Sequence, residues 1–460
     1  MKGVQMPTES GKRSGHGMRV LVTVFVLFLL VLIAALAGFK PMARSLGWLT
    51  ANPAGTPSLN QMVPGSQLFS DSGERGSAPD PTALSQRLAQ VGKPIGSTAG
   101  MLILDSSGQE LYADGADQAL VPASNMKILT TAAALSVLPP DTTFQTRTVL
   151  AATDLVVLIG GGDPSLTAEP GSGPSTRELA KETAAALTEQ GLTSVSVAYD
   201  DSLFVGPSWH PSWPADDIGY VGPVTALTLD AGYLSSTRTF STTPSEDALR
   251  VFASQLSEFG VTVTSALGFS QAPDDAVALA SVRSGSLLSL ASVAMEYSLN
   301  VQTEILLRHL ASASGEEPSF AGGVKSLSTA LQNMGLDVSQ SNFSDGSGMS
   351  YQNRVTPRLL ANAVFISVTD PVLSRLIPGM PVAGATGTLE ERFYAPGSEA
   401  AKGFVTAKTG TLNGVAALSG VTQTVDGAVV IFSMEVNDGF GDLRAYLDRS
   451  AAAITSCGCG

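Results

Sequence analysis

The most prominent hydrophobic pattern in the chain is an unbroken apolar stretch near its start. Residues 20–39 include no charged side chain and are rich in Val, Leu and Phe. At about 1.5 Å per residue, this stretch spans about 30 Å, the hydrocarbon thickness of a bilayer. Basic residues outnumber acidic ones before it, so the positive-inside rule predicts a cytoplasmic N-terminus at 1–19 and an extracytoplasmic body.

The apolar stretch has two interpretations. Ala35-Leu36-Ala37 resembles a signal-peptidase site, but the apolar run is longer than the usual signal core of about 7–15 residues. We therefore expect an uncleaved transmembrane anchor at 20–39, with a cleaved signal segment and a secreted protein as the alternative. Residues 40–80 are rich in Pro, Gly, Ser and Ala without a sustained period, which predicts a flexible spacer.

The remaining pattern predicts a mixed α/β body. Apolar residues recur with helical spacing, and these segments are 82–91, about 124–138, 177–190, 245–258, 287–311, 322–334 and 441–454. Strand-like runs occupy 100–104, 110–113, several short pieces of 143–159, then 404–408, 416–422 and 429–436. Pro139-Pro140 ends the helix that begins near Ser124, because proline cannot continue a helix.

Composition narrows the possible chemistry. The 460 residues are 44% hydrophobic and 14% charged, which is enough for large cores and suggests about three modules. The net charge of −14 makes nucleic acid an unsuitable partner. Three histidines leave little room for a His metal site or a Ser-His-Asp triad, so hydrolytic chemistry would need another base.

The only cysteines, Cys457 and Cys459, lie within the last four residues. Their position excludes a disulfide-framed core and a Cys-rich zinc module, and it argues against a cysteine nucleophile in the body. Cysteines two apart can close only a strained ring, so free or intermolecular thiols compete with a disulfide. The simplest expectation for this end is a frayed tail without a role.

Three short motifs follow one another along the body: Ser124-Asn125-Met126-Lys127, Ser298-Leu299-Asn300 and Lys408-Thr409-Gly410-Thr411. Each is weak alone, and a second Ser-x-Asn occurs by chance in the spacer at Ser58. Lys127, however, is the only one of the nine lysines with a serine three positions before it. The order of the motifs and their settings at a helix start, a helical stretch and a strand make the set specific.

The first motif has a clear physical basis. Ser124 and Lys127 are one helical turn apart on the same face, so the hydroxyl and the amine can meet. A neutral Lys127 could then act as the general base on Ser124, which requires its pKa to fall about 3 units below about 10.4. Burial and the nearby Lys408 cation would both act in that direction. An oxyanion hole could combine the Ser124 N–H with that of Thr411.

These residues resemble the low-molecular-mass class C penicillin-binding proteins, the D-alanyl-D-alanine carboxypeptidase/endopeptidase family with SxxK, SxN and KTG motifs. The resemblance runs from about residue 82 to residue 454 and includes Leu158-Ile-Gly-Gly-Gly-Asp-Pro164 and Asp345-Gly-Ser-Gly348. It implies an α/β (α+β) transpeptidase/β-lactamase-like fold, with an antiparallel sheet flanked by helices and an inserted β-rich domain. The implied domains are a catalytic domain at 81–144 and 286–456 and an inserted accessory domain at 145–285.

The resemblance also implies residue roles. Ser124 would form an acyl-enzyme, with Lys127 as its base, Ser298 as a proton relay and Lys408 as a positive charge. Substrate-binding residues implied in the same way are Asn300, Thr409, Gly410, Thr411, Asp345 and Ser347. Leu299 replaces the commoner Asp or Asn, and the interval between Ser124 and Ser298 is short for the family. The interval still implies an inserted domain between the two halves of the catalytic fold, but the accessory domain nested there is expected to be trimmed or absent relative to the family's full architecture.

The function implied by the resemblance is removal of the terminal D-alanine from peptidoglycan stem peptides, with cleavage of D,D-crosslinks left open as a second activity. β-Lactams would be covalent inhibitors, and no metal or organic cofactor is implied. The alternative is a catalytically weak β-lactam-binding or cell-wall-binding protein on the same scaffold. A β-lactamase is a third reading, against which the long insert argues.

Overall fold

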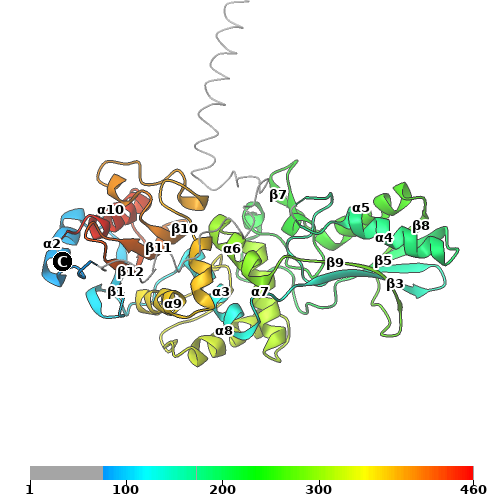
Figure 1. The fold of residues 1–460 in the computed structure, drawn as a ribbon, viewed down its shortest axis with the longest axis horizontal. Helices are drawn as coiled ribbons and strands as arrows, with labels where there is room; N and C mark the ends of the chain where they lie inside the picture. The colour runs from blue at the N-terminus through cyan, green and yellow to red at the C-terminus, as the bar shows by residue number, and fades with distance from the viewer. Residues whose placement is uncertain (1–75, 172, 459–460) are drawn as a thin grey trace, which may run out of the picture. The chain divides into compact units, whose positions relative to one another are not determined.

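The computed structural model describes residues 76–171 and 173–458. Its first sheet has five antiparallel strands in the order β10-β11-β12-β1-β2 (Figure 1). These strands are β1 (Thr98–Asp105), β2 (Glu110–Asp114), β10 (Thr406–Leu412), β11 (Val415–Gln423) and β12 (Val429–Asn437). The predicted antiparallel sheet is confirmed, and β10 forms one open edge of it.

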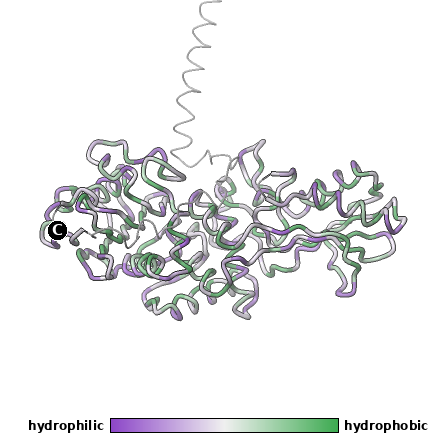
Figure 2. Tube along the Cα trace, viewed as in Figure 1, coloured by the Kyte–Doolittle hydropathy of each residue, from purple (hydrophilic) through white to green (hydrophobic). Residues whose placement is uncertain are grey.

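Helices cover both faces of this sheet, which explains the nearly continuous apolar runs in β11 and β12. In β1, Leu102 and Leu104 join the core on one face, and Met101 and Ile103 join the core on the other. The first face is covered by α3 (Met126–Val137), α7 (Asn300–Ala313), α8 (Phe320–Asn333) and α9 (Pro357–Thr369), and the second by α2 (Pro81–Val91) and α10 (Leu443–Thr455). Figure 2 shows hydrophobic residues concentrated along these packed elements.

A second five-stranded sheet, in the order β8-β5-β4-β3-β9, lies in the predicted insert. Its strands are β3 (Gln145–Ala152), β4 (Leu155–Ile159), β5 (Ser194–Asp200), β8 (Thr262–Phe269) and β9 (Val277–Arg283). β4, β5 and β8 are parallel, so each is linked to the next by a crossover that includes a helix, α4 (Thr176–Glu189) or α5 (Pro244–Glu258). An inserted sheet is therefore present, accompanied by two helices, while its exact domain boundaries stay a prediction.

The structure corrects two of the predicted elements. The continuous helix expected over 287–311 is wrong: α6 (Leu287–Tyr297) ends and α7 begins at Asn300. Ser298 between them has a φ of 58°, a left-handed conformation that cannot continue a right-handed helix. The strand expected at 404–408 begins later and extends to Leu412, so it contains the whole third motif.

Within residues 76–171 and 173–458, no single helix is both long and apolar enough to cross a membrane. α9 and the following 3-10 helix Leu373–Gly379 reach that length and composition only together, with a bend of 106° between them. The predicted anchor and cytoplasmic N-terminus lie outside the described residues, as does nearly all of the spacer. At the other end, the expected frayed tail is wrong for Cys457, which is fully buried in the core beside α10.

Candidate active site

Ser124 lies in a tight turn at the start of α3. The 3-10 helix Ala123–Asn125 leads directly into α3, and Ala123 before the serine has a φ of 46°. Such a conformation is strained for a residue with a Cβ and persists only where neighbours enforce it. A Cβ at Gly348 would lie 1.8 Å from the Ala123 carbonyl oxygen, and one at Gly410 would lie 2.8 Å from that of Pro122. Glycine at both positions lets two other segments close on the turn.

Lys127 is fully buried directly behind Ser124. Its Nζ lies 3.0 Å from Ser124 Oγ, 2.6 Å from Asn300 Oδ1 and 2.7 Å from the Ser347 carbonyl oxygen. Burial lowers the pKa of Lys127 to about 7, although the negative charges of Asp345 and Glu304 act in the opposite direction. Near neutral pH a large fraction of this amine is therefore unprotonated and within proton-transfer distance of the serine.

Lys408 is also fully buried, on β10, and its Nζ donates to the Thr409 carbonyl oxygen at 2.9 Å. Burial, followed by the positive charge of Lys127, holds the pKa of Lys408 well below its usual value. Repulsion between the two buried amines disfavours charge on both of them at once. Desolvation is the main cause for Lys127.

The second motif occupies the break between α6 and α7. The left-handed Ser298 turns the chain, and within the described residues its hydroxyl has no hydrogen-bond partner. Asn300, the first residue of α7, accepts from Lys127 and donates from Nδ2 to the Tyr220 carbonyl oxygen at 2.9 Å. The Asn300 amide thus joins the base to a loop of the insert.

The glycine-containing loop 345–348 lies behind the base. Asp345 is fully buried and accepts from the backbone N–H groups of Gly348 and Ser350 and from the side chains of Asn353 and Trp213. Ser347 is also fully buried, and within the described residues its hydroxyl has no partner. Asp345 therefore holds the loop in shape, and the Ser347 carbonyl contacts Lys127. The assignment of both residues to substrate binding stays a prediction.

The third motif forms the open edge of the sheet. β10 and β11 pair up to Leu412 and Val415 and are joined by the two-residue turn Asn413-Gly414. Hydrogen-bonded and non-hydrogen-bonded pairs alternate along an antiparallel ladder, and in such a hairpin the pair that closes the turn is hydrogen-bonded. The pairs Thr411–Ala416 and Thr409–Leu418 are therefore not hydrogen-bonded, so the N–H and C=O groups of Thr411 and Thr409 point away from β11. The contact from Lys408 Nζ to the Thr409 carbonyl agrees with this pattern.

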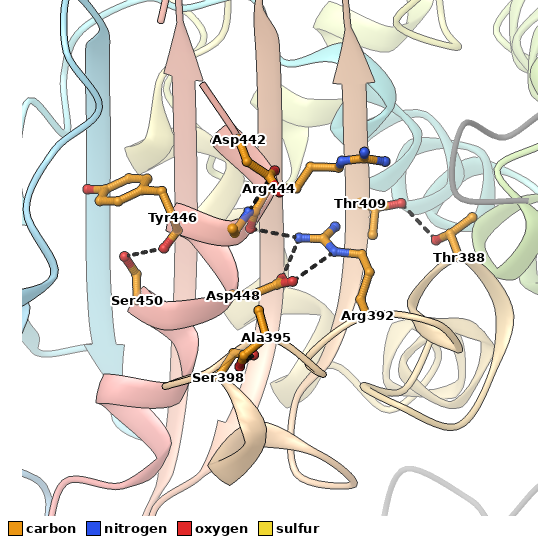
Figure 3. Close-up of polar contacts among 11 residues, drawn as sticks. Thr388, Arg392, Ala395, Ser398, Thr409, Asp442, Arg444, Tyr446, Asp448 and Ser450 are labelled. Carbon is orange, nitrogen blue, oxygen red and sulfur yellow. Dashed lines mark hydrogen bonds and ion pairs between the residues drawn. The ribbon is translucent and has the colours of Figure 1, made fainter. Parts of the chain in front are cut away.

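A segment beside β10 supports the Thr409 side chain. The hydroxyls of Thr409 and Thr388 lie 2.7 Å apart and point toward one another (Figure 3). Further along the same segment, Arg392 forms a largely buried ion pair with Asp448 of α10. That ion pair anchors the segment to the sheet domain and thereby holds Thr388 next to the open edge.

Sequence reasoning missed Glu304 and Arg308, which share one face of α7 with Asn300 at four-residue intervals. Glu304 is fully buried and accepts from the Ser347 N–H at 2.7 Å and the Gly346 N–H at 3.0 Å. Arg308 donates to the carbonyl oxygens of Val205 and Pro207 in the insert. The spacing of Asn300, Glu304 and Arg308 along one face of the helix was the available signal.

Trp213 and Tyr220 were also missed as site residues, because their contacts join segments far apart in sequence. The Trp213 indole donates to Asp345 at 2.8 Å, and the Tyr220 carbonyl accepts from Asn300. Among the residues that the structure describes, no cluster of three His, Cys, Asp or Glu side chains could hold a metal ion.

Comparisons with known proteins agree with this arrangement. The model of the D-Ala-D-Ala carboxypeptidase 3 (S13) family matches residues 81–240 and 234–454. The chain is 34% identical over 462 residues to carboxypeptidase DacB of Mycolicibacterium smegmatis, covering 98% of each chain. Penicillin-binding protein 4 of Haemophilus influenzae has a similar fold, with a TM-score of 0.68, 22% identity and coverage of 81% of this chain and 98% of that one. Its structure in complex with a β-lactam gives a TM-score of 0.61 at 22% identity and the same coverage.

Proposed function

The chain belongs to the D-Ala-D-Ala carboxypeptidase 3 (S13) family and is a serine-type D-Ala-D-Ala carboxypeptidase, and from this premise we propose how its own residues perform the reaction. The observation that carries the proposal is the 3.0 Å contact between Ser124 Oγ and the buried amine of Lys127. A buried amine with a lowered pKa is the base that a serine needs where histidine is absent.

In the acylation step, neutral Lys127 takes the proton of Ser124 while Oγ attacks the carbonyl carbon of the penultimate D-alanine. The peptide bond to the terminal D-alanine breaks, and the leaving amine receives a proton through Ser298. Water then attacks the ester, gives a proton back through the same groups and releases the shortened peptide and Ser124. The N–H groups of Ser124 and Thr411 would hold the oxyanion in both steps.

The substrate lies along the open edge of β10 in this proposal. Its terminal carboxylate meets Lys408 and the hydroxyls of Thr409 and Thr411, close to Gly410, and Asn300 bonds its peptide amide. A carboxylate favours the charged form of a neighbouring amine, so substrate binding raises the lowered pKa of Lys408. Lys408 therefore gains its proton when the charge is needed to hold the substrate.

A labelled penicillin tests the nucleophile. The full-length protein should form a covalent adduct that Ser124→Ala abolishes, while release of D-alanine from a soluble pentapeptide falls by about a thousandfold or more. Ser136→Ala is the matched control, since Ser136 bonds only within its own helix, α3. An adduct that persists in Ser124→Ala would refute the assignment. Acylation of the wild type without release of D-alanine would favour a penicillin-binding protein of weak catalytic activity.

We also propose that residues 20–39 anchor the protein in the membrane with the catalytic domain outside the cytoplasm, where peptidoglycan stem peptides and β-lactams are available. The support is the charge-free apolar run and the basic residues before it. Membrane fractionation combined with sequencing of the mature N-terminus tests this. Recovery in the soluble fraction of a chain that begins after residue 37 would instead establish cleavage.

A further inference from the structure

One long connection in the insert contacts the active site and also lines a separate pocket. Residues 201–243 link β5 to α5 and include two short paired strands, β6 (Tyr233–Leu234) and β7 (Thr239–Phe240). Trp213 and Tyr220 of this connection contact the active site through Asp345 and Asn300. Other parts of the same connection line a second hollow, an open pocket of about 200 Å³ between the end of β5 and the start of α5.

The pocket is rich in hydroxyl and carboxylate groups. Polar side chains in its lining are those of Tyr199, Asp201, Ser208, Thr225, Thr242, Thr243, Ser245 and Glu246. Within the described residues, the hydroxyls of Tyr199, Ser208 and Thr242 form no hydrogen bond, and Asp201 uses only Oδ2, which accepts from Ser245. These groups are therefore available to a ligand.

The chemistry of the lining selects a class of ligand. No Lys, Arg or His lines the pocket, and two carboxylates do, so a phosphate or a free carboxylate would be repelled. Hydroxyls that both donate and accept, next to carboxylates that only accept, match the hydroxyl and acetamido groups of a neutral sugar. Pro223 and Pro244 add apolar surface for the face of a sugar ring.

The pocket lies close enough to the active site for one substrate molecule to reach both. Pro223 lines the pocket and is three residues from Tyr220, whose carbonyl contacts Asn300, so the connecting chain spans at most about 10 Å. A stem peptide hangs from its glycan strand through about four residues, which can extend about 14 Å. The lactyl carboxyl of that sugar forms an amide with the peptide, so the strand is neutral at this point.

We propose that this pocket binds an N-acetylhexosamine unit of the glycan strand whose stem peptide occupies the active site. The proposal rests on the carboxypeptidase function above, because it concerns the polymer that carries the same substrate. Binding of the sugar would hold the stem peptide near Ser124 and favour polymeric peptidoglycan over free peptides.

The test uses the full-length protein, a soluble pentapeptide, insoluble pentapeptide-bearing peptidoglycan and an N-acetylglucosamine tetramer. The double variant Thr242→Val/Glu246→Gln removes one hydroxyl and one charge at exposed positions of the pocket. Its matched control is Thr262→Val/Glu189→Gln, which makes the same changes at exposed positions of the insert outside the pocket. Tetramer binding and the ratio of D-alanine release from polymer to release from free peptide are measured for each protein.

We expect the pocket variant to bind the tetramer about tenfold more weakly and to release D-alanine from polymer about tenfold more slowly, with its rate on the free pentapeptide unchanged. The control should match the wild type in all three measurements. Tetramer affinity and a polymer-to-peptide ratio that are equal in the two variants would overturn the glycan site while leaving the carboxypeptidase intact. A wild type inactive on the free pentapeptide would instead refute the carboxypeptidase.

Discussion

The two five-stranded sheets of this chain differ in how their faces and edges are covered. In the first sheet, β11 and β12 are buried along almost their whole length because helices pack on both faces. In the insert, one face packs on α4 and α5, only a small cluster covers the other, and the edge strands β8 and β9 are mostly exposed. The first sheet is a rigid support, whereas the insert is a thinner layer with open surface.

The residues proposed for the active site follow this difference. Ser124, Lys127, Asn300 and Lys408 all come from elements of the first sheet and its helices, where close packing can desolvate two amines. The insert contributes to the site through one indole and one backbone carbonyl. The proposed catalytic residues thus lie in the well-packed part of the chain, and the insert contacts them through these two groups.

The largest expected effect is on the free energy of unfolding, when a leucine is shortened in each of the two sheets. Leu418→Ala on the fully buried β11 should lower the free energy of unfolding by about 2–5 kcal/mol, because it leaves a cavity between sheet and helices. Leu267→Ala on β8, where the side chain is 59% exposed, should change it by about 0.5 kcal/mol or less. Denaturant unfolding of both variants checks this pair. Equal losses would contradict the contrast between the sheets.

The next effect concerns Glu304, which accepts from the loop that supports Lys127, the proposed base. Glu304→Leu would leave the buried N–H groups of Gly346 and Ser347 unpaired, at about 1–3 kcal/mol each. Burial raises the pKa of Glu304 to about 8, so only a minor fraction of this carboxyl is charged near pH 7. Glu304→Gln keeps one acceptor and removes that fraction of charge, which raises the pKa of Lys127. Neutral Lys127 would then exist at slightly lower pH, so the rising limb of the kcat/KM profile should move slightly below its wild-type position near pH 7.

The groups that act on Lys127 from the elements around it are Asp345, Glu304 and the neighbouring Lys408. Glu317→Gln removes an exposed acidic charge just beyond the end of α7 and serves as the control, whose pH profile should match the wild type. If the rising limb of Glu304→Gln stays in place or moves to higher pH, Glu304 does not tune the base.

Part of this arrangement was predictable from local sequence. The antiparallel sheet follows from its apolar runs, and the order of three motifs anticipates that Ser124, Lys127 and Asn300 meet. The break at Ser298 was not predictable, because serine gives no local signal for the left-handed conformation that the surrounding helices enforce. Glu304 had a signal in the polar stripe of α7. Trp213 and Tyr220 had none, since their contacts exist only in the folded chain.

A smaller effect tests the link between insert and active site. Trp213→Phe removes one of four hydrogen bonds to Asp345 and should lower kcat/KM on free pentapeptide about three- to tenfold, equivalent to about 1 kcal/mol. Trp209→Phe is the matched control in the same loop, because its indole donates to the Trp213 carbonyl and not to Asp345. A similar loss in both variants would indicate general loosening of the loop.

The smallest expected effect lies at the open edge of the sheet. Thr388→Val removes the hydroxyl partner of Thr409, which is then free to rotate away from the substrate carboxylate. We expect KM to rise about two- to fivefold with kcat nearly unchanged, because one hydrogen bond between neutral groups contributes about 1 kcal/mol or less. Thr388→Ser keeps the hydroxyl and should restore the wild-type KM. If Ser fails to rescue, the methyl group of Thr388, and so packing of the segment against β10, controls this end of the site. If neither variant changes KM, the Thr409 hydroxyl does not bind substrate, and recognition of the carboxylate falls to Lys408 and Thr411.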